Sequence, residues 1–308
     1  MTRRHLGIRR CLTRWAFGAL LGVAAIANAA AAPFELPPVV QPASAEHHWG
    51  KVIWVDLITP DTADAKRFYG GLFGWTFQDI HTGDIDYSVA LLDGAPVGGL
   101  VQRNIRPGES RHPSWLTFIS VKDVDEAERI TLANGGKVLS PPRTYAQRGR
   151  QAVFADPQGA VFAVLQSSSG DPLDVLPVPG DWIWSSLLTR DPDAEAAFYQ
   201  TVFGYEVFAL PSDDGVKHLL LSTDNYARAS LNAMPPKASK LHPHWLNFVR
   251  VISAADAVAK VKSLGGRVLV APHPDRQGGL IAVVADPAGA PFGLLEWTDS
   301  DSKKEVTK

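Results

Sequence analysis

Apolar and polar positions alternate in some segments of the chain and fall on helical stripes in others, and the two patterns follow a fixed order. Residues 52–58 alternate, which predicts a strand. The next segment places its apolar side chains on one stripe and predicts a helix that weakens at Gly70-Gly71. A strand, a helix capped by Asp123 and further strands then follow. The predicted strands after the first are 87–92, 97–102, 115–121, 137–140, 151–155 and 160–166.

Six short motifs recur at a constant spacing of 130 residues. The first strand recurs around Trp184, and Phe68-Tyr69 recurs as Phe198-Tyr199. The other pairs are Phe73-Gly74 with Phe203-Gly204, His112 with His242, Gly135-Gly136 with Gly265-Gly266, and Asp156 with Asp286. One spacing for six motifs indicates that a whole domain is duplicated, with two βαβββ modules in each copy.

The first residues of the chain have the pattern of a secretory signal: a basic segment, a short apolar run and small residues for cleavage. The general and twin-arginine export routes both stay open. We expect a periplasmic or secreted protein without a stable membrane span after processing. The predicted parts are a signal peptide (1–31), a Pro-rich extended lead (32–48), a first domain (49–167), a linker (168–180), a second domain (181–298) and a charged tail (299–308).

Composition removes several classes of function. The only cysteine, Cys11, lies in the signal, so the mature part has no disulfide, thiolate cluster or cysteine nucleophile. Without residues 1–31, 25 basic residues face 32 acidic ones, a formal charge of −7. We therefore expect no nucleic-acid partner. The sequence does not indicate an oligomeric state.

The order of these motifs resembles the vicinal-oxygen-chelate superfamily, which contains glyoxalases, bleomycin-resistance proteins and dioxygenases. The strand, the helix with Phe-Tyr, Phe-Gly and the late Asp-Pro-x-Gly carry the resemblance, which covers both repeats. It implies the α+β class, with two tandem domains of two βαβββ modules each. In that family each domain forms a cupped mixed sheet, with helices on the convex side and a metal or ligand on the concave side.

Family enzymes bind a divalent ion through His, Glu or Gln on the first and last strands of each module. Here the resemblance implies Trp54 and Trp184, Leu116 and Leu246 (or Trp115 and Trp245), Ala163 and Gly293, and the region of Gly98–Leu100. These side chains offer no suitable lone pair, so we expect no metal and no other cofactor. The alternative is a displaced metal site that uses Asp56, His244 or Glu296.

Strand alternation predicts which side chains face the cups. Ile53, Val55 and Leu57 are expected under the helices, and Leu116 and Phe118 in the core. Arg148, in a loop near the last hairpin, is expected to be solvated. The predicted ligand-binding side chains are Trp54, Asp56, Trp115, Thr117, Trp184, Ser186, Trp245 and Asn247.

Three functions remain open. Aromatic walls with few polar groups favour a metal-free protein that binds a small, aromatic or apolar molecule. The alternative is a glyoxalase- or dioxygenase-like enzyme that uses a displaced metal or Asp56 as acid or base. In the third, tryptophans fill both cups and the protein is structural.

The signal predicts the start of the mature protein. Because the small residues follow the apolar run, the exported protein should begin between about Ala30 and Pro33. Mass spectrometry of the periplasmic or secreted fraction measures this. A species there that retains Arg14 would contradict the prediction.

Overall fold

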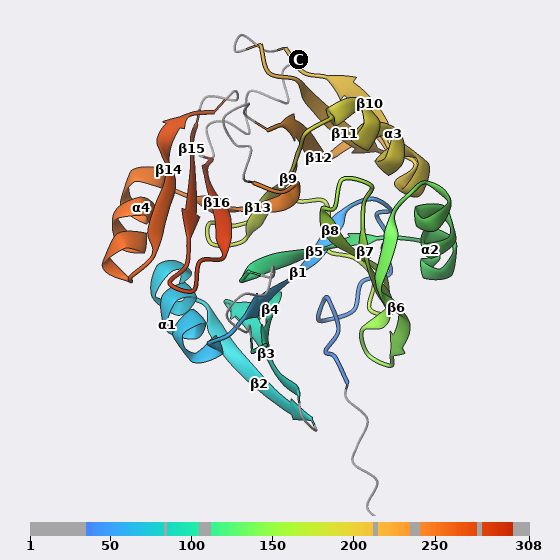
Figure 1. The fold of residues 1–308 in the computed structure, drawn as a ribbon. Coiled ribbons are helices and arrows are strands. Elements are labelled where there is room, and N and C mark those ends of the chain that lie inside the picture. Colours follow the sequence, from blue (N-terminus) through green and yellow to red (C-terminus); the bar gives the residue numbers. More distant parts are fainter. Residues whose placement is uncertain are drawn as a thin grey trace, which may run out of the picture. The chain divides into compact units, whose positions relative to one another are not determined.

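The computed structural model describes residues 35–82, 85–104, 112–211, 215–234, 241–275 and 279–297. These residues form two mixed sheets of eight strands, one from each repeat (Figure 1). The α+β class and the tandem arrangement are therefore as predicted. The predicted signal (1–31) and charged tail (299–308) lie outside the described residues.

Sheet A, from the first repeat, has the strand order β2-β3-β4-β1-β5-β8-β7-β6. Its strands are β1 (Val52–Thr59), β2 (Thr76–Thr82), β3 (Ile85–Leu92), β4 (Ala95–Gln102), β5 (Ser114–Ser120), β6 (Lys137–Tyr145), β7 (Gly149–Ala155) and β8 (Val161–Ser167). The helices are α1 (Thr62–Phe73) and α2 (Val124–Ala133). Helix α1 runs past Gly70-Gly71 and ends at Gly74, whose left-handed backbone (φ 78°) suits glycine.

Sheet B repeats this order with β10-β11-β12-β9-β13-β16-β15-β14. Its strands are β9 (Trp182–Thr189), β10 (Glu206–Ala209), β11 (His218–Thr223), β12 (Tyr226–Ala233), β13 (His244–Val251), β14 (Arg267–Pro274), β15 (Leu280–Ala285) and β16 (Pro291–Glu296). The helices are α3 (Pro192–Phe203) and α4 (Ala254–Ser263). In both sheets the modules meet at their first strands, which pair antiparallel.

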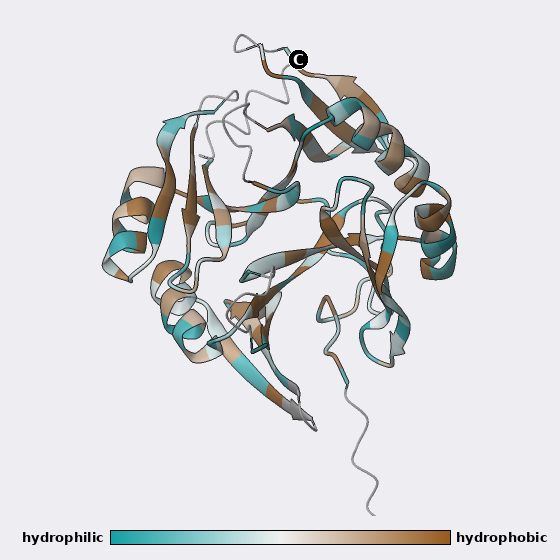
Figure 2. Cartoon of the chain, in the orientation of Figure 1, coloured by the Kyte–Doolittle hydropathy of each residue, from teal (hydrophilic) through white to brown (hydrophobic). Residues whose placement is uncertain are grey.

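Each sheet is curved, and its helices lie on one face (Figure 1). We call the opposite, concave face of sheet A the first cup and that of sheet B the second cup. Apolar residues are concentrated on the strands and on the sides of the helices that pack on them (Figure 2). Among the described residues, none of the helices is both long and apolar enough to cross a membrane.

The helix-covered faces of the two repeats pack against each other. Helix α1 shares a core with α4, β15 and β16 of the second repeat, and α3 shares a core with α2, β7 and β8 of the first. Tyr69 OH donates to Asp286 Oδ2 at 3.3 Å, and Tyr199 OH donates to Asp156 Oδ2 at 3.1 Å. Because these contacts repeat at a spacing of 130 residues, the interface is built from the same patch twice.

One pair of equivalent residues marks the centre of this interface. Asn247 Nδ2 donates to Thr117 Oγ1 at 2.9 Å, and these residues are 130 positions apart. Equivalent residues contact each other only near a twofold axis. The repeats are therefore related by a pseudo-twofold axis that passes close to Thr117 and Asn247.

A buried carboxyl distinguishes one half of the interface from the other. Glu195 on α3 is 1% exposed, whereas the equivalent position of the first repeat is Ala65. Burial, together with the negative charge of Asp156, raises the pKa of Glu195 from 4.5 to about 8. A carboxyl whose pKa is raised on folding stabilises the fold at low pH. That stability is lost as the pH rises through the folded pKa.

Glu195→Gln should therefore change the pH dependence of stability. The amide mimics the protonated carboxyl, so we expect little change in the free energy of unfolding at pH 5 and a gain of up to about 5 kcal/mol at pH 9. Urea denaturation at both pH values measures this. Glu206→Gln, on the exposed face of β10, is the matched control. Parallel pH profiles for wild type and Glu195→Gln would contradict the assignment.

Candidate functional site

The predicted site residues of the first repeat lie on two opposite faces of sheet A. Trp54 and Asp56 lie in the first cup, as alternation predicts. Trp115 and Thr117 were expected beside them, and this placement is wrong. Trp115 packs under α1, where its Nε1 donates to Tyr69 OH at 3.0 Å, and Thr117 lies in the interface between the repeats.

Strand pairing explains the error. β1 and β5 are antiparallel, and Trp54 lies opposite Phe118. Opposed residues share a face, so Phe118 and Leu116 face the cup. Both faces of β5 carry apolar side chains, and alternation alone could not choose between them. Ile53 also faces the cup, because the pairing is irregular just before Trp54.

The second repeat shows the same division. Trp184 and Ser186 lie in the second cup. The placement of Trp245 and Asn247 there is wrong: Trp245 is buried in the interface, where its Nε1 donates to Tyr199 OH at 3.0 Å, and Asn247 is also buried there. The structure therefore retains Trp54, Asp56, Trp184 and Ser186 as cup residues.

A closed polar cluster forms the floor of the first cup. Trp54 Nε1 and Tyr87 OH both donate to Asp56 Oδ1, each at 2.8 Å. The guanidinium of Arg148 lies 4.1 Å from the centroid of the Trp54 ring, and its Nη2 donates to Tyr87 OH at 3.2 Å. The expectation of a solvated Arg148 is wrong, since this side chain is 1% exposed. Arg148 and Tyr87 are the cup residues that the sequence did not reveal.

Gly99 makes room for this cluster. A Cβ atom at Gly99 would lie 2.0 Å from Tyr87 OH and 2.2 Å from Asp56 Oδ1. Burial raises the pKa of Asp56, and the charge of Arg148 opposes the rise. The Gly98-Gly99 pair is a sequence signal of this arrangement, because glycine in a strand often marks a place where other groups approach the backbone closely.

The N-terminal lead covers the first cup (Figure 1). Leu36 and Val39 are 5% and 1% exposed, and they pack with Trp54, Tyr87 and Phe118. The sequence predicted an extended lead but gave no sign that it fills the cup. The first cup is thus occupied by the chain itself.

The second cup contains a chain of polar side chains. Ser230 Oγ accepts from Trp184 Nε1 at 3.1 Å and from Asn232 Nδ2 at 3.2 Å. Ser186 Oγ lies 2.7 Å from Ser230 Oγ, and His218 Nδ1 lies 2.6 Å from Asn232 Oδ1. The assigned orientation of the Asn232 amide makes His218 Nδ1 the donor in that last contact.

The two cups differ in chemistry and in exposure. Strand pairing places Ser186 where the first cup has Asp56, and His218 where it has Tyr87. Tyr87 is buried, whereas Trp184 and His218 are partly exposed. The second cup therefore offers a partly exposed indole and imidazole above buried hydroxyl groups.

Two models of known families match these cupped sheets. Residues 51–164 match the glyoxalase/bleomycin resistance protein/dioxygenase superfamily, and residues 184–295 match a glyoxalase-like domain. The chain belongs to the glyoxalase/bleomycin resistance protein/dioxygenase superfamily.

Relatives within this superfamily are similar over nearly their whole length. CFP32 of Mycobacterium bovis, provisionally named a glyoxylase, is 32% identical over 257 residues, which cover 83% of this chain and 98% of the relative. The anthracycline biosynthesis protein DauV of Streptomyces sp. strain C5 is 31% identical, with coverage of 80% and 93%.

Solved structures of superfamily members share the fold. The Mn(II)-bound glyoxalase of Novosphingobium aromaticivorans is 16% identical with a TM-score of 0.56, and covers 81% of this chain and 83% of its own. The 2,3-dioxygenase LapB of Pseudomonas sp. KL28 is 14% identical with a TM-score of 0.55, and covers 82% and 93%.

The residues of this superfamily member do not fit the family's metal site. Trp54, Leu116 and Ala163 lie on the concave face of sheet A, where the resemblance places metal ligands, but indole and alkyl groups do not coordinate a divalent ion. The displaced candidates are engaged elsewhere: Glu296 Oε2 accepts from Ala254 N at 2.9 Å. Within the described ranges, no three His, Cys, Asp or Glu side chains are grouped to hold a metal.

Chelation should therefore leave the protein unchanged. A metal bound only by the folded state would stabilise it by about 2.7 kcal/mol at one hundred times its dissociation constant, and EDTA would remove that stability. We expect the same melting temperature with and without EDTA, measured by scanning calorimetry. A drop that a single divalent metal reverses would contradict this prediction.

Proposed function

We propose that the protein binds a small aromatic or otherwise apolar molecule in the second cup, without a metal ion. The observation that carries the proposal is Trp184, a partly exposed ring whose N–H is fixed by Ser230. An indole held in this way can stack on a flat ligand. Leu246 and Phe248 pack on the same face, where they form the buried apolar layer beneath this ring.

The direction of the hydrogen bonds in the second cup favours a ligand with an oxygen acceptor. Ser230 Oγ accepts from Trp184 and Asn232, which uses both of its lone pairs, so its own O–H donates to Ser186 Oγ. The proton of Ser186 then points away from Ser230. It can donate to a carbonyl or phenolic oxygen at the edge of an aromatic ring.

The names of two relatives support a ligand of this class. DauV and DnrV, 31% and 30% identical to this chain, are anthracycline biosynthesis proteins. An anthracycline carries fused aromatic rings with carbonyl and phenolic oxygens, which are the groups that an indole wall and a hydroxyl donor recognise.

An enzyme that uses Asp56 as acid or base is the second candidate. The raised pKa of this carboxyl favours such a role. Against it, Trp54 and Tyr87 both donate to Oδ1, and the lead covers the cup. The second cup is therefore a better supported site than Asp56, and we favour binding over catalysis.

We also propose that the mature protein lies in the periplasm or outside the cell, because residues 1–31 have the pattern of a secretory signal.

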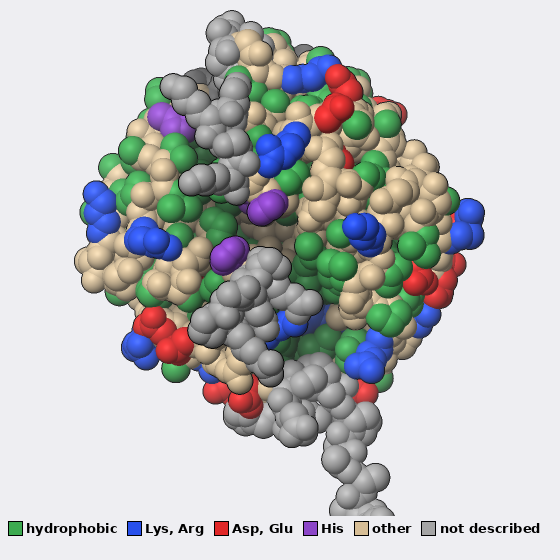
Figure 3. All heavy atoms as spheres, in the orientation of Figure 1, with side chains coloured by type: hydrophobic (Ala, Val, Ile, Leu, Met, Phe, Trp, Pro, Cys, Tyr) green, Lys and Arg blue, Asp and Glu red, His purple; other side chains and the backbone are tan. Residues whose placement is uncertain are grey.

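The distribution of charge agrees with a small-molecule ligand. On the face in Figure 3, Lys and Arg side chains are scattered among acidic and apolar ones. Nucleic-acid sites cluster their basic side chains on one face.

Trp184→Ala tests the binding function. With the neutral probe 1-hydroxyanthraquinone, we expect the Kd of this variant to be about tenfold or more above that of the wild-type protein, because stacking and the apolar wall are lost. Isothermal titration calorimetry measures the Kd in buffer with EDTA. Tyr226→Ala, which removes an exposed aromatic ring at the turn between β11 and β12, is the control and should bind as wild type. Equal affinity of Trp184→Ala and wild type would refute the second cup as the site.

A further inference from the structure

The first cup is filled by a part of the chain that is separate from its sheet. Residues 35–51 precede β1 and run outside the sheet (Figure 1). Of these, Leu36 and Val39 supply the buried side chains that meet the aromatic floor. The lead thus occupies the position that a bound apolar molecule would take.

The upstream half of the lead is held by a few hydrogen bonds at the rim. Ser169 Oγ accepts from Val39 N at 3.1 Å and from Val40 N at 3.2 Å. Ser44 N donates to Ser169 O at 2.8 Å. These contacts come mainly from one linker residue, and one more joins Ala146 N to Glu35 Oε2 at 2.9 Å. The upstream half is therefore joined to sheet A by few polar contacts.

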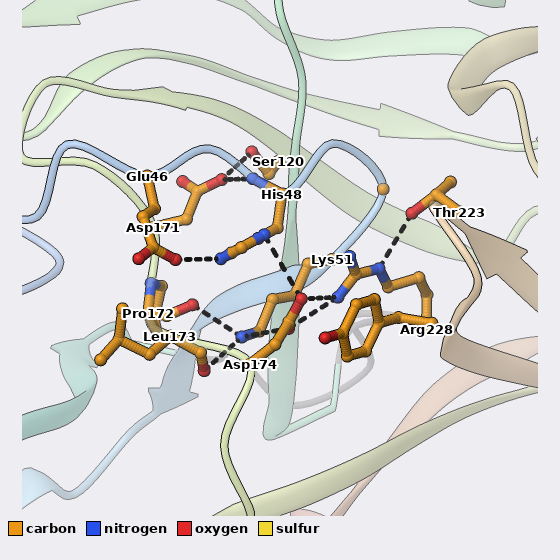
Figure 4. A network of polar contacts seen from close by, with 12 residues as sticks. Glu46, His48, Lys51, Ser120, Asp171, Pro172, Leu173, Asp174, Thr223 and Arg228 are labelled. Atoms are coloured by element: carbon orange, nitrogen blue, oxygen red, sulfur yellow. Dashed lines mark hydrogen bonds and ion pairs between the residues drawn. The ribbon is translucent and has the colours of Figure 1, made fainter.

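The downstream end of the lead is anchored by charge (Figure 4). His48 N donates to Asp171 Oδ2 at 2.7 Å, and Lys51 Nζ lies 2.9 Å from Asp174 Oδ1. Arg228 of the second repeat also donates to Asp174, at 2.7 Å. The downstream end of the lead is therefore held by ion pairs, whereas the upstream half has only a few hydrogen bonds and two buried apolar side chains.

Beneath the lead lies a buried cation with spare donor capacity. Arg148 Nε has no hydrogen-bond partner among the described residues, although the side chain is 1% exposed. Its Nη2 donates to a neutral phenol, Tyr87, and the carboxylate of Asp56 is already bonded by Trp54 and Tyr87. A buried guanidinium with a free N–H is suited to an anionic group.

We infer that the first cup is a second ligand site, for a small apolar molecule that carries an acidic group, and that residues 35–45 are its removable occupant. The apolar part of the ligand replaces Leu36 and Val39 in the cluster that they form with Trp54, Tyr87 and Phe118. The acidic group receives a hydrogen bond from Arg148 Nε. This site does not depend on binding in the second cup.

The test opens the first cup by a double substitution. Leu36→Ala with Val39→Ala removes the side chains that fill it, and Leu176→Ala with Val178→Ala removes the same side chains from exposed positions of the linker. The probe is 1-anilinonaphthalene-8-sulfonate, and calorimetric titration gives the number bound per chain. We expect the first variant to bind the additional probe about tenfold or more tightly than the control, because no side chain competes for the cup. Equal affinities would overturn the inference.

The acidic group is tested with a neutral analogue. N-phenyl-1-naphthylamine has the same rings without the sulfonate, and we expect it to bind the opened site about tenfold more weakly or worse. Equal affinity of the two probes would overturn the acidic class of ligand. The comparison leaves Arg148 in place.

Wild-type protein provides a readout that does not depend on the folding of a variant. The amides of Val39 and Val40 donate to Ser169, so they are expected to be protected from hydrogen exchange. Saturating sulfonate probe should speed their exchange, because the lead is displaced. Unchanged exchange at saturation would overturn the proposal. Trp184→Ala should give the same result as wild type, which separates this site from the second cup.

Discussion

Burial of aromatic side chains between the two repeats is the interaction on which the rest of the structure depends. Tyr69 of the first repeat packs on Trp115 of its own repeat and on Phe292 of the second, and Tyr199 packs in the same way on Phe162 of the first repeat. An aromatic side chain buries 150–250 Å². The helices of each repeat pack on the other repeat as well as on their own sheet. The aromatic face of each sheet is therefore covered by both repeats together.

This constraint leaves the concave faces free to differ. The interface uses matched pairs at both ends, so a change on the convex side affects contacts with the other repeat. The cups carry no such pairing, and their floors have diverged: Asp56 and Tyr87 of the first cup correspond to Ser186 and His218 of the second. The first cup is a closed core, whereas His218 and Asn232 of the second cup are partly exposed.

The sequence predicted the repeated modules, but it missed the faces of β5 and β13 and the contacts that are particular to one copy. The spacing of 130 residues and the module order gave both sheets, because each motif was seen twice. The faces of β1 followed from Trp54 and Asp56, but β5 is apolar on both sides and Trp115 was misplaced. The buried position of Arg148 and the insertion of Leu36 depend on contacts between distant segments, which local patterns do not record.

The lead fills the first cup and, by competing with ligands, also determines which of them can bind there. The buried side chains of Leu36 and Val39 favour the closed form, and the entropy cost of ordering the lead opposes it. If one molecule in about a hundred is open, the apparent affinity of a ligand falls about a hundredfold. The first cup then binds only ligands of high intrinsic affinity, whereas the lead does not compete with a ligand of the second cup.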